Sequence, residues 1–299
     1  MGEMRAANGL LGDRVRLRAL FADEGYLFFR GVLDAAAVRT TAEQVVRTLV
    51  EQRFLDTSSA WTGRALTASV DTELQDALNS QQLWERLVAV PAVAAFFAAI
   101  AGAPVGFIPL ARYRIMPPGG TTQVHQDALL NPGFAMTTAW IPLMAIDAGL
   151  GGLAVVRGSH RGGCVAAEAL PPLDGSWLRA DYEPGDVVLM HEALVHTGLP
   201  NRSRDEVRVS IDVRFQDPAA PAAVVGRITA VDVDVDAASV HIASEDGGIV
   251  TLGVDDSTLL RSSTGARIPL DGLLASELAP GRRVIASRRD GHAVMIKPL

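Results

Sequence analysis

The sequence predicts a mainly β fold with flanking helices at its N-terminal end and a second, smaller β-barrel at its C-terminal end. Three observations predict it. Residues 12–101 carry apolar side chains at helical spacing. From Phe107 the apolar residues form short or alternating runs between Pro, Gly, Asn and Asp, which is typical of antiparallel strands. Strict alternation begins again in the last 75 or so residues, after a stretch rich in Ala and Pro.

The N-terminal part, residues 1–105, is expected to be helical, with one short strand at "LFFRGVL". Asp34 precedes an amphipathic run that places Val38, Val45 and Leu49 on its inner face. Its carboxylate can accept hydrogen bonds from the free N–H groups of the first helical turn. The predicted helices span residues 12–26, 34–53, 71–79 and 82–101.

Residues 106–216 are expected to form antiparallel β-structure, folded as a sandwich or a barrel. Residues 217–224, "DPAAPAAV", suit an extended linker because they consist almost entirely of Ala and Pro. Residues 225–299 then alternate apolar and polar side chains, with a turn at "DGG". This last part is similar to small OB-like β-barrel domains, and the sequence assigns it no role.

The composition disfavours several classes of function. The net charge is −7 and no block of Lys or Arg occurs, so a nucleic-acid partner is not expected, because phosphate binding needs clustered cations. Cys164 is the one cysteine, which excludes an internal disulfide and a cysteine-based zinc site. The N-terminus lacks a signal-peptide pattern, and the most apolar run contains three prolines. We therefore expect a cytoplasmic protein with no membrane partner.

A histidine and an aspartate lie two residues apart in "QVHQDALL", a run with the texture of a strand. Alternation in a strand would point His125 and Asp127 to the same side, where both could bind one metal ion. The commoner reason for such a pair is a solvated face of a sheet. A metal site needs a third ligand, and His196, at the end of "DVVLMHEALVH", is the best candidate. His191, five residues earlier, is expected to line the site or face solvent.

Two histidines and one carboxylate form the facial triad that holds non-haem Fe(II) and leaves three coordination positions open. Twelve residues after His196, "VRVSIDVRF" places Arg208, Ser210 and Arg214 on one face of a strand. A guanidinium binds a carboxylate through two parallel hydrogen bonds, so Arg208 with Ser210 suits the distal carboxylate of 2-oxoglutarate. Arg214 is the competing anchor, and a surface arginine without function is the other alternative.

Together, "HQD", "TTAWIPLMAIDAGLGGLAVVRGSHRGG", "EPGDVVLMHEALVHTGLPN" and "RVS" resemble the phytanoyl-CoA dioxygenase family of Fe(II)/2-oxoglutarate-dependent oxygenases. The resemblance runs from "DEGYLFFRGVLD" to about Phe215 and implies a double-stranded β-helix, or jelly-roll, core. It implies no catalytic residue beyond the metal ligands. The implied ligands of Fe(II) are His125, Asp127 and His196, and the implied contacts of 2-oxoglutarate are Arg208 and Trp140, to which the strand pattern adds Ser210.

The resemblance also implies an activity, the oxidation of a C–H bond in a small organic molecule with release of succinate and CO2. Hydroxylation in bacterial specialised metabolism is the simplest form, and desaturation, epoxidation or cyclisation are alternatives at the same site. Asp127 implies oxygenation rather than halogenation, because related halogenases carry a small residue in its place. The expected substrate contacts are Arg112, Phe134 and Met136, with the loop around residues 54–70.

Two functions from other classes compete with this hypothesis. One is a non-catalytic jelly-roll protein that binds a small molecule and keeps a relic metal site. The intact set of three ligands and Arg208 argues against it. The other gives the main role to the C-terminal barrel, as an oligonucleotide-binding module. Its sparse aromatic residues and mixed charge argue against that, because single strands bind to stacking platforms in a basic groove.

Overall fold

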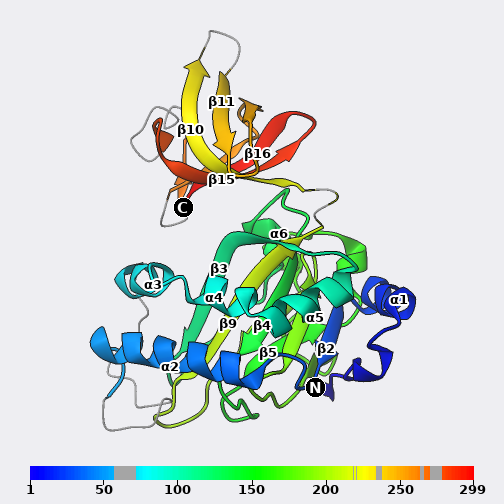
Figure 1. Ribbon diagram of the computed structural model, residues 1–299. Helices are drawn as coiled ribbons and strands as arrows, with labels where there is room; N and C mark the ends of the chain where they lie inside the picture. Colours follow the sequence, from blue (N-terminus) through cyan, green and yellow to red (C-terminus); the bar gives the residue numbers. More distant parts are fainter. Residues whose placement is uncertain (57–71, 218, 220, 234–237, 263–265, 270–277) are drawn as a thin grey trace. The chain divides into compact units, whose positions relative to one another are not determined.

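The computed structural model describes residues 1–56, 72–217, 219, 221–233, 238–262, 266–269 and 278–299 (Figure 1). The loop predicted around residues 54–70 lies mostly outside this described part. Contacts within the chain group it into two compact units. Unit 1 comprises Met1–Val105, Leu110–Asp127 and Thr137–Phe215, and unit 2 comprises Gly106–Pro109, Ala128–Met136 and Gln216–Leu299. The domain boundaries drawn from the sequence stay predictions.

In the described residues before β3 (Gly106–Met116), unit 1 contains the strand β2 (Tyr26–Phe29) between its first two helices, and these helices: α1 (Arg14–Glu24), α2 (Ala35–Glu51), α3 (Thr72–Asn79), α4 (Leu83–Ala89) and α5 (Pro91–Ala101). Asp34 caps α2 as predicted, accepting hydrogen bonds from Ala36 N at 2.8 Å and Ala37 N at 3.0 Å. The single helix predicted over residues 82–101 is wrong. The helix stops at Val90, whose ψ of 125° is extended, because Pro91 excludes its preceding residue from the helical region.

In the described part of the chain, no single helix is both long and apolar enough to cross a membrane. The stretch Glu73–Ala89 taken together with Pro91–Ala101 meets the length and composition required, but it bends by 68° at its break. Length and composition are the only support for that pair, and α5 packs its aromatic side chains inside unit 1.

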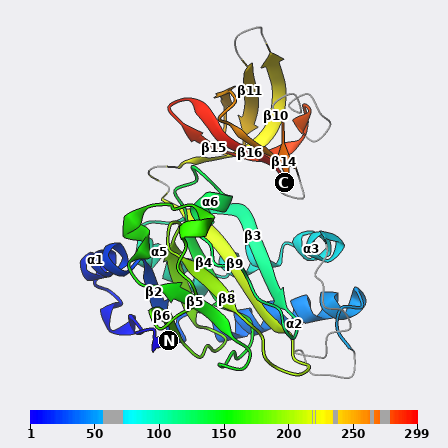
Figure 2. The same cartoon turned by 180° about the vertical axis from the view of Figure 1, so that it is seen from behind.

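Two sheets form the core of unit 1, which confirms the predicted jelly roll (Figures 1 and 2). In the larger sheet the order is β2-β7-β4-β9-β3, and in the smaller it is β1-β6-β5-β8. The larger sheet contains β2 (Tyr26–Phe29), β7 (Val187–His191), β4 (Thr137–Pro142), β9 (Arg208–Gln216) and β3 (Gly106–Met116). The smaller contains β1 (Gly2–Glu3), β6 (Trp177–Arg179), β5 (Gly152–Val156) and β8 (His196–Leu199).

Helix α5 covers the outer face of the larger sheet. Phe96 packs edge-to-face on Phe29 of β2, and Phe97 packs in the same way on Phe215 of β9, each with ring centroids 5.4 Å apart. Every residue of β9 is buried, because one face of the strand meets the helices and the other faces the interior of unit 1. Alternation therefore places the polar side chains of β9 between the two sheets: Arg208, Ser210, Asp212 and Arg214.

The two segments that carry the proposed metal ligands differ from their predicted form. The run around His125 is not a strand. His125 forms only an isolated antiparallel bridge with His196, and Asp127 begins the short helix α6 (Asp127–Leu130). The run "DVVLMHEALVH" is not one strand either. It turns after His191, where Leu194 N donates to His191 O at 2.9 Å, so that β7 and β8 belong to different sheets.

Unit 2 contains the predicted small barrel. Its sheet has the order β12-β11-β10-β15-β16-β13-β14, and an additional β12–β16 pairing closes five strands into a barrel. Buried aliphatic side chains such as Ile228, Val240 and Ile296 fill it. The first strand starts at Ala223, inside the predicted linker. The strands are β10 (Ala223–Val233), β11 (Ala238–Ser244), β12 (Ile249–Val254), β13 (Leu259–Arg261), β14 (Arg267–Ile268), β15 (Arg283–Arg289) and β16 (His292–Pro298).

Candidate metal centre

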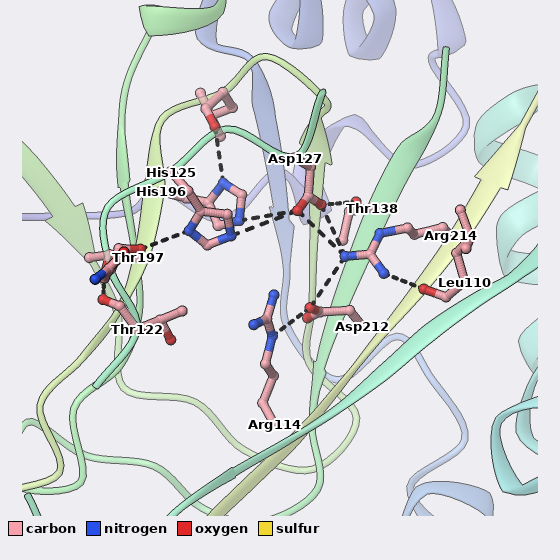
Figure 3. A network of polar contacts seen from close by, with 12 residues as sticks. Leu110, Arg114, Thr122, His125, Asp127, Thr138, His196, Thr197, Asp212 and Arg214 are labelled. Atoms are coloured by element: carbon pink, nitrogen blue, oxygen red, sulfur yellow. Dashed lines mark hydrogen bonds and ion pairs between the residues drawn. The ribbon is translucent and has the colours of Figure 1, made fainter. Parts of the chain in front are cut away.

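Three side chains converge inside unit 1, as Figure 3 shows. Asp127 Oδ1 lies 3.7 Å from His125 Nε2 and 3.9 Å from His196 Nε2. The two histidines are held together by their backbones, which exchange N–H···O bonds of 3.0 Å in both directions. Two atoms that each lie about 2.1 Å from one ion can be at most about 4.2 Å apart, so these distances fit a shared divalent cation.

The protonation of the imidazoles also fits a metal. His125 Nδ1 is 2.8 Å from Gln123 O, and His196 Nδ1 is 3.0 Å from Leu194 O. A carbonyl oxygen only accepts, so each Nδ1 carries a proton, and a neutral ring then has its lone pair on Nε2. Burial and the neighbouring His196 lower the pKa of His125 to about 4, which keeps its ring neutral.

Among the described residues, His125 Nε2 is buried and has no hydrogen-bond donor. An imidazole lone pair that faces a carboxylate oxygen at under 4 Å is repelled by it unless a cation lies between them. The donor set, two imidazoles and one carboxylate, is the facial triad typical of non-haem Fe(II). The residues present therefore fit this metal.

The carboxylate of Asp127 is held by two further side chains (Figure 3). Thr138 Oγ1 donates to Oδ2 at 2.6 Å, and Arg214 Nη2 lies 3.4 Å from both oxygens. Burial would raise the pKa of Asp127, but Arg214, His196 and the Thr138 hydrogen bond hold it well below its usual range. Arg214 also donates a hydrogen bond to Leu110 O, which holds its guanidinium beside Asp127.

A cavity opens beside the triad. His125, His196, Trp140 and Arg208 line it, as do Arg114, Thr122, Leu153, Met190, Gly198 and Asp212. The indole of Trp140 packs edge-to-face on Tyr182, with ring centroids 4.6 Å apart. Arg114 was not among the predicted contacts, although the alternation in "RYR" places it on the same face as Arg112.

Arg208 and Ser210 present unused hydrogen-bonding groups. Arg208 Nη1 donates to Leu199 O at 2.8 Å and, more weakly, to Leu150 O at 3.3 Å. Within the described part of the chain, Arg208 Nε and Ser210 Oγ are buried and have no partner. Burial, and then the charge of Arg114, lowers the pKa of Arg208 to about 10. An anion at this place would satisfy both groups and compensate the buried charge.

The other predicted residues lie away from the cavity. Arg112 is exposed on β3, while Phe134 and Met136 are buried in the segment that groups with unit 2. None of the three is among the residues that line the cavity. Their assignment as substrate contacts stays a prediction. His191 packs against His160, with ring centroids 4.9 Å apart, and it does not line the cavity either.

Comparison with known proteins places the chain in a family. The model of the phytanoyl-CoA dioxygenase (PhyH) family matches residues 21–210. Two relatives are named 1-deoxypentalenic acid 11-beta-hydroxylase. The one from Streptomyces arenae is 32% identical and the one from Streptomyces exfoliatus 30%, each over 69% of this chain and 82% of the relative. Both comparisons cover the larger part of the chain.

A solved structure shows the same fold. EctD from S. alaskensis, crystallised with 2-oxoglutarate and 5-hydroxyectoine, superposes with a TM-score of 0.52 at 19% identity. The superposition covers 68% of this chain and 76% of EctD. The family match ends at residue 210, before the first strand of the small barrel. The chain therefore belongs to the phytanoyl-CoA dioxygenase family and is a non-haem Fe(II)- and 2-oxoglutarate-dependent oxygenase.

Proposed function

We propose that the protein hydroxylates an unactivated C–H bond of a small organic acid in bacterial specialised metabolism, consuming 2-oxoglutarate and O2. The observation that carries the proposal is the His125–Asp127–His196 triad, whose two histidines line one cavity together with Arg208. The two relatives named as hydroxylases of an acid support both the reaction and the substrate class. The cytoplasmic location and the lack of nucleic-acid and membrane partners stay predictions.

The protein's own side chains position the metal and its co-substrate. Bound iron supplies the oxidising chemistry, with 2-oxoglutarate as the electron donor. The carbonyl groups of Gln123 and Leu194 fix the planes of the two imidazoles, so that both Nε2 atoms point to one place. Trp140 and Leu153, which are 5% and 3% exposed, form apolar walls of the cavity and limit the entry of water.

Arg208 and Ser210 suit the distal carboxylate of 2-oxoglutarate. Arg208 Nε and Ser210 Oγ are both buried without a hydrogen-bond partner among the described residues, and both belong to the interior face of β9. A carboxylate can accept from both of them in a charge-assisted arrangement. The competing anchor, Arg214, contacts Asp127 and Leu110 instead and does not line the cavity. We therefore assign the 2-oxoglutarate contact to Arg208.

Position 198 must stay a glycine if Arg208 is to keep its place. A Cβ there would lie 2.8 Å from Arg208 Nη2 and 2.6 Å from Thr122 Oγ1. We expect Gly198→Ala to displace the guanidinium and raise the KM for 2-oxoglutarate about tenfold, equivalent to about 1.4 kcal/mol. Steady-state kinetics would measure this, with Gly175→Ala as control, since a Cβ at Gly175 meets no atom within 4 Å. Equal KM values for both variants would contradict the assignment.

Arg114 is a second guanidinium on the cavity, and we propose that it binds a carboxylate of the substrate. Its Nε donates to Asp212 Oδ2 at 2.8 Å, and the rest of the group points toward the two imidazoles (Figure 3). Burial opposes the charge of Arg114, but Asp212 and Asp127 outweigh it and raise its pKa, so the group stays cationic. A cation buried beside an apolar wall favours an anionic ligand.

Replacing Arg114 by glutamine is expected to raise the KM for the substrate about 10–100-fold, because a hydrogen bond to a charged group contributes about 1.5–3 kcal/mol. The KM for 2-oxoglutarate should change little. Arg112→Gln is the matched variant, since Arg112 shares the face of β3 without lining the cavity. A larger effect from Arg112→Gln would assign the substrate contact to that residue instead.

A turnover assay tests the proposed reaction. Purified protein with Fe(II), ascorbate, 2-oxoglutarate and 1-deoxypentalenic acid, or a panel of related carboxylic acids, should release succinate together with a product heavier by one oxygen atom. Use of ¹⁸O2 should place the label in that product. A product lighter by two hydrogen atoms would indicate desaturation or cyclisation and overturn hydroxylation. Release of succinate that no acid stimulates would overturn the substrate class.

A further inference from the structure

The three side chains of the triad are held in place in different ways. Each imidazole is oriented by a backbone carbonyl, through its Nδ1. The carboxylate of Asp127 is oriented by side chains. Thr138 lies on β4, is 1% exposed, and donates its hydroxyl to Oδ2 at 2.6 Å. The other oxygen, Oδ1, is the one at 3.7 Å and 3.9 Å from the two Nε2 atoms.

We propose that Thr138 is a positioning residue that makes Asp127 bind the metal through Oδ1 alone. A carboxylate can coordinate through one oxygen or through both, and the second mode would occupy one more coordination position. The facial triad functions because it leaves three positions open for co-substrate and O2. A hydroxyl that donates to Oδ2 in a short, charge-assisted bond keeps that oxygen turned away from the metal.

The surroundings of Asp127 support this role. Arg214 Nη2 lies 3.4 Å from both carboxylate oxygens, so it balances the charge without selecting one of them. The hydrogen bond from Thr138, in contrast, reaches Oδ2 and not Oδ1. Arg214 is itself fixed by Leu110 O and lies 3.7 Å from Asp212. Arg214 thus restrains the position of the Asp127 carboxylate, and the hydroxyl of Thr138 sets which of its two oxygens faces the imidazoles.

Binding of Co(II) to the apo-protein tests the proposal without turnover. Thr138→Val removes the hydroxyl at nearly constant volume, and Thr138→Ser keeps it. The Thr138→Val variant is expected to bind Co(II) about 10-fold more weakly in competition with a chelating dye, because partners of metal ligands contribute about 10–100-fold to affinity. Its visible Co(II) spectrum should shift toward that of a higher coordination number. Thr138→Ser should restore both readouts.

A matched control separates this role from a general effect on the fold. Thr137→Val makes the same change one residue earlier on β4, where the side chain points to the other face, and it should leave Co(II) binding and spectrum unchanged. Wild-type affinity and spectrum for Thr138→Val would overturn the proposal while the metal centre stands. The inference rests on the proposed metal centre, and failure of the unmodified protein to bind Co(II) would overturn both.

Discussion

Replacing His196 by alanine is expected to lower the affinity for Fe(II) at least about 100-fold and to abolish turnover. Loss of a mere partner of a metal ligand costs about 10–100-fold in affinity, and loss of a ligand costs no less. The variant should still fold. The bonds that pair His196 with His125 are made by backbone atoms, which alanine keeps. Binding of Fe(II) under anaerobic conditions, measured by competition with a chelator, gives the result directly.

His191→Ala is the control for this variant. It removes an imidazole only five residues earlier, from a side chain that packs against His160 and does not line the cavity. We expect wild-type affinity for Fe(II) in His191→Ala. If the two variants lost affinity equally, the effect would come from damage to the turn between β7 and β8, and His196 would no longer be supported as a ligand.

Replacing Arg208 by alanine is expected to weaken the binding of 2-oxoglutarate by about 2–5 kcal/mol, the cost of removing one partner of a buried charge pair. Ser210 Oγ and the carboxylate would be left without the cation. The affinity of Arg208→Lys for 2-oxoglutarate should lie between those of the wild type and Arg208→Ala, because lysine keeps the charge and lacks the planar guanidinium. Calorimetry of 2-oxoglutarate binding to the Fe(II)-loaded protein without O2 measures the affinity. An unchanged affinity in Arg208→Ala would transfer the anchor to Arg114.

Local signals predicted much of the fold. The cap at Asp34, the alternation of β9 and the small barrel follow from residue spacing within single segments. The break at Val90 was also encoded in Pro91, but a continuous apolar pattern across it favoured one helix. The β12–β16 pairing that closes the barrel joins distant segments, and the periodicity of one strand cannot predict its partner.

The site was predictable to the extent that it depends on residue type and order. Both histidines, the carboxylate and Arg208 meet at the cavity or beside it. The hypothesis of a continuous strand through His125 failed because Asp127 starts a helix, yet the backbone bridge to His196 achieves the same convergence. Alternation places Arg112 and Arg114 on one face of β3, so it cannot predict which of them lines the cavity. That depends on how far along the strand each residue lies. The contact between Thr138 and Asp127 depends on the path of the chain between them, which the spacing of residues in the sequence does not predict.

The most direct measurement is a crystal structure of the protein with Mn(II) and 2-oxoglutarate, analysed by anomalous scattering from the metal. We predict one anomalous peak within bonding distance of His125 Nε2, Asp127 Oδ1 and His196 Nε2, with the distal carboxylate of 2-oxoglutarate on Arg208 and Ser210. A peak elsewhere, or a triad whose side chains bind no metal at saturating Mn(II), would contradict the proposed centre.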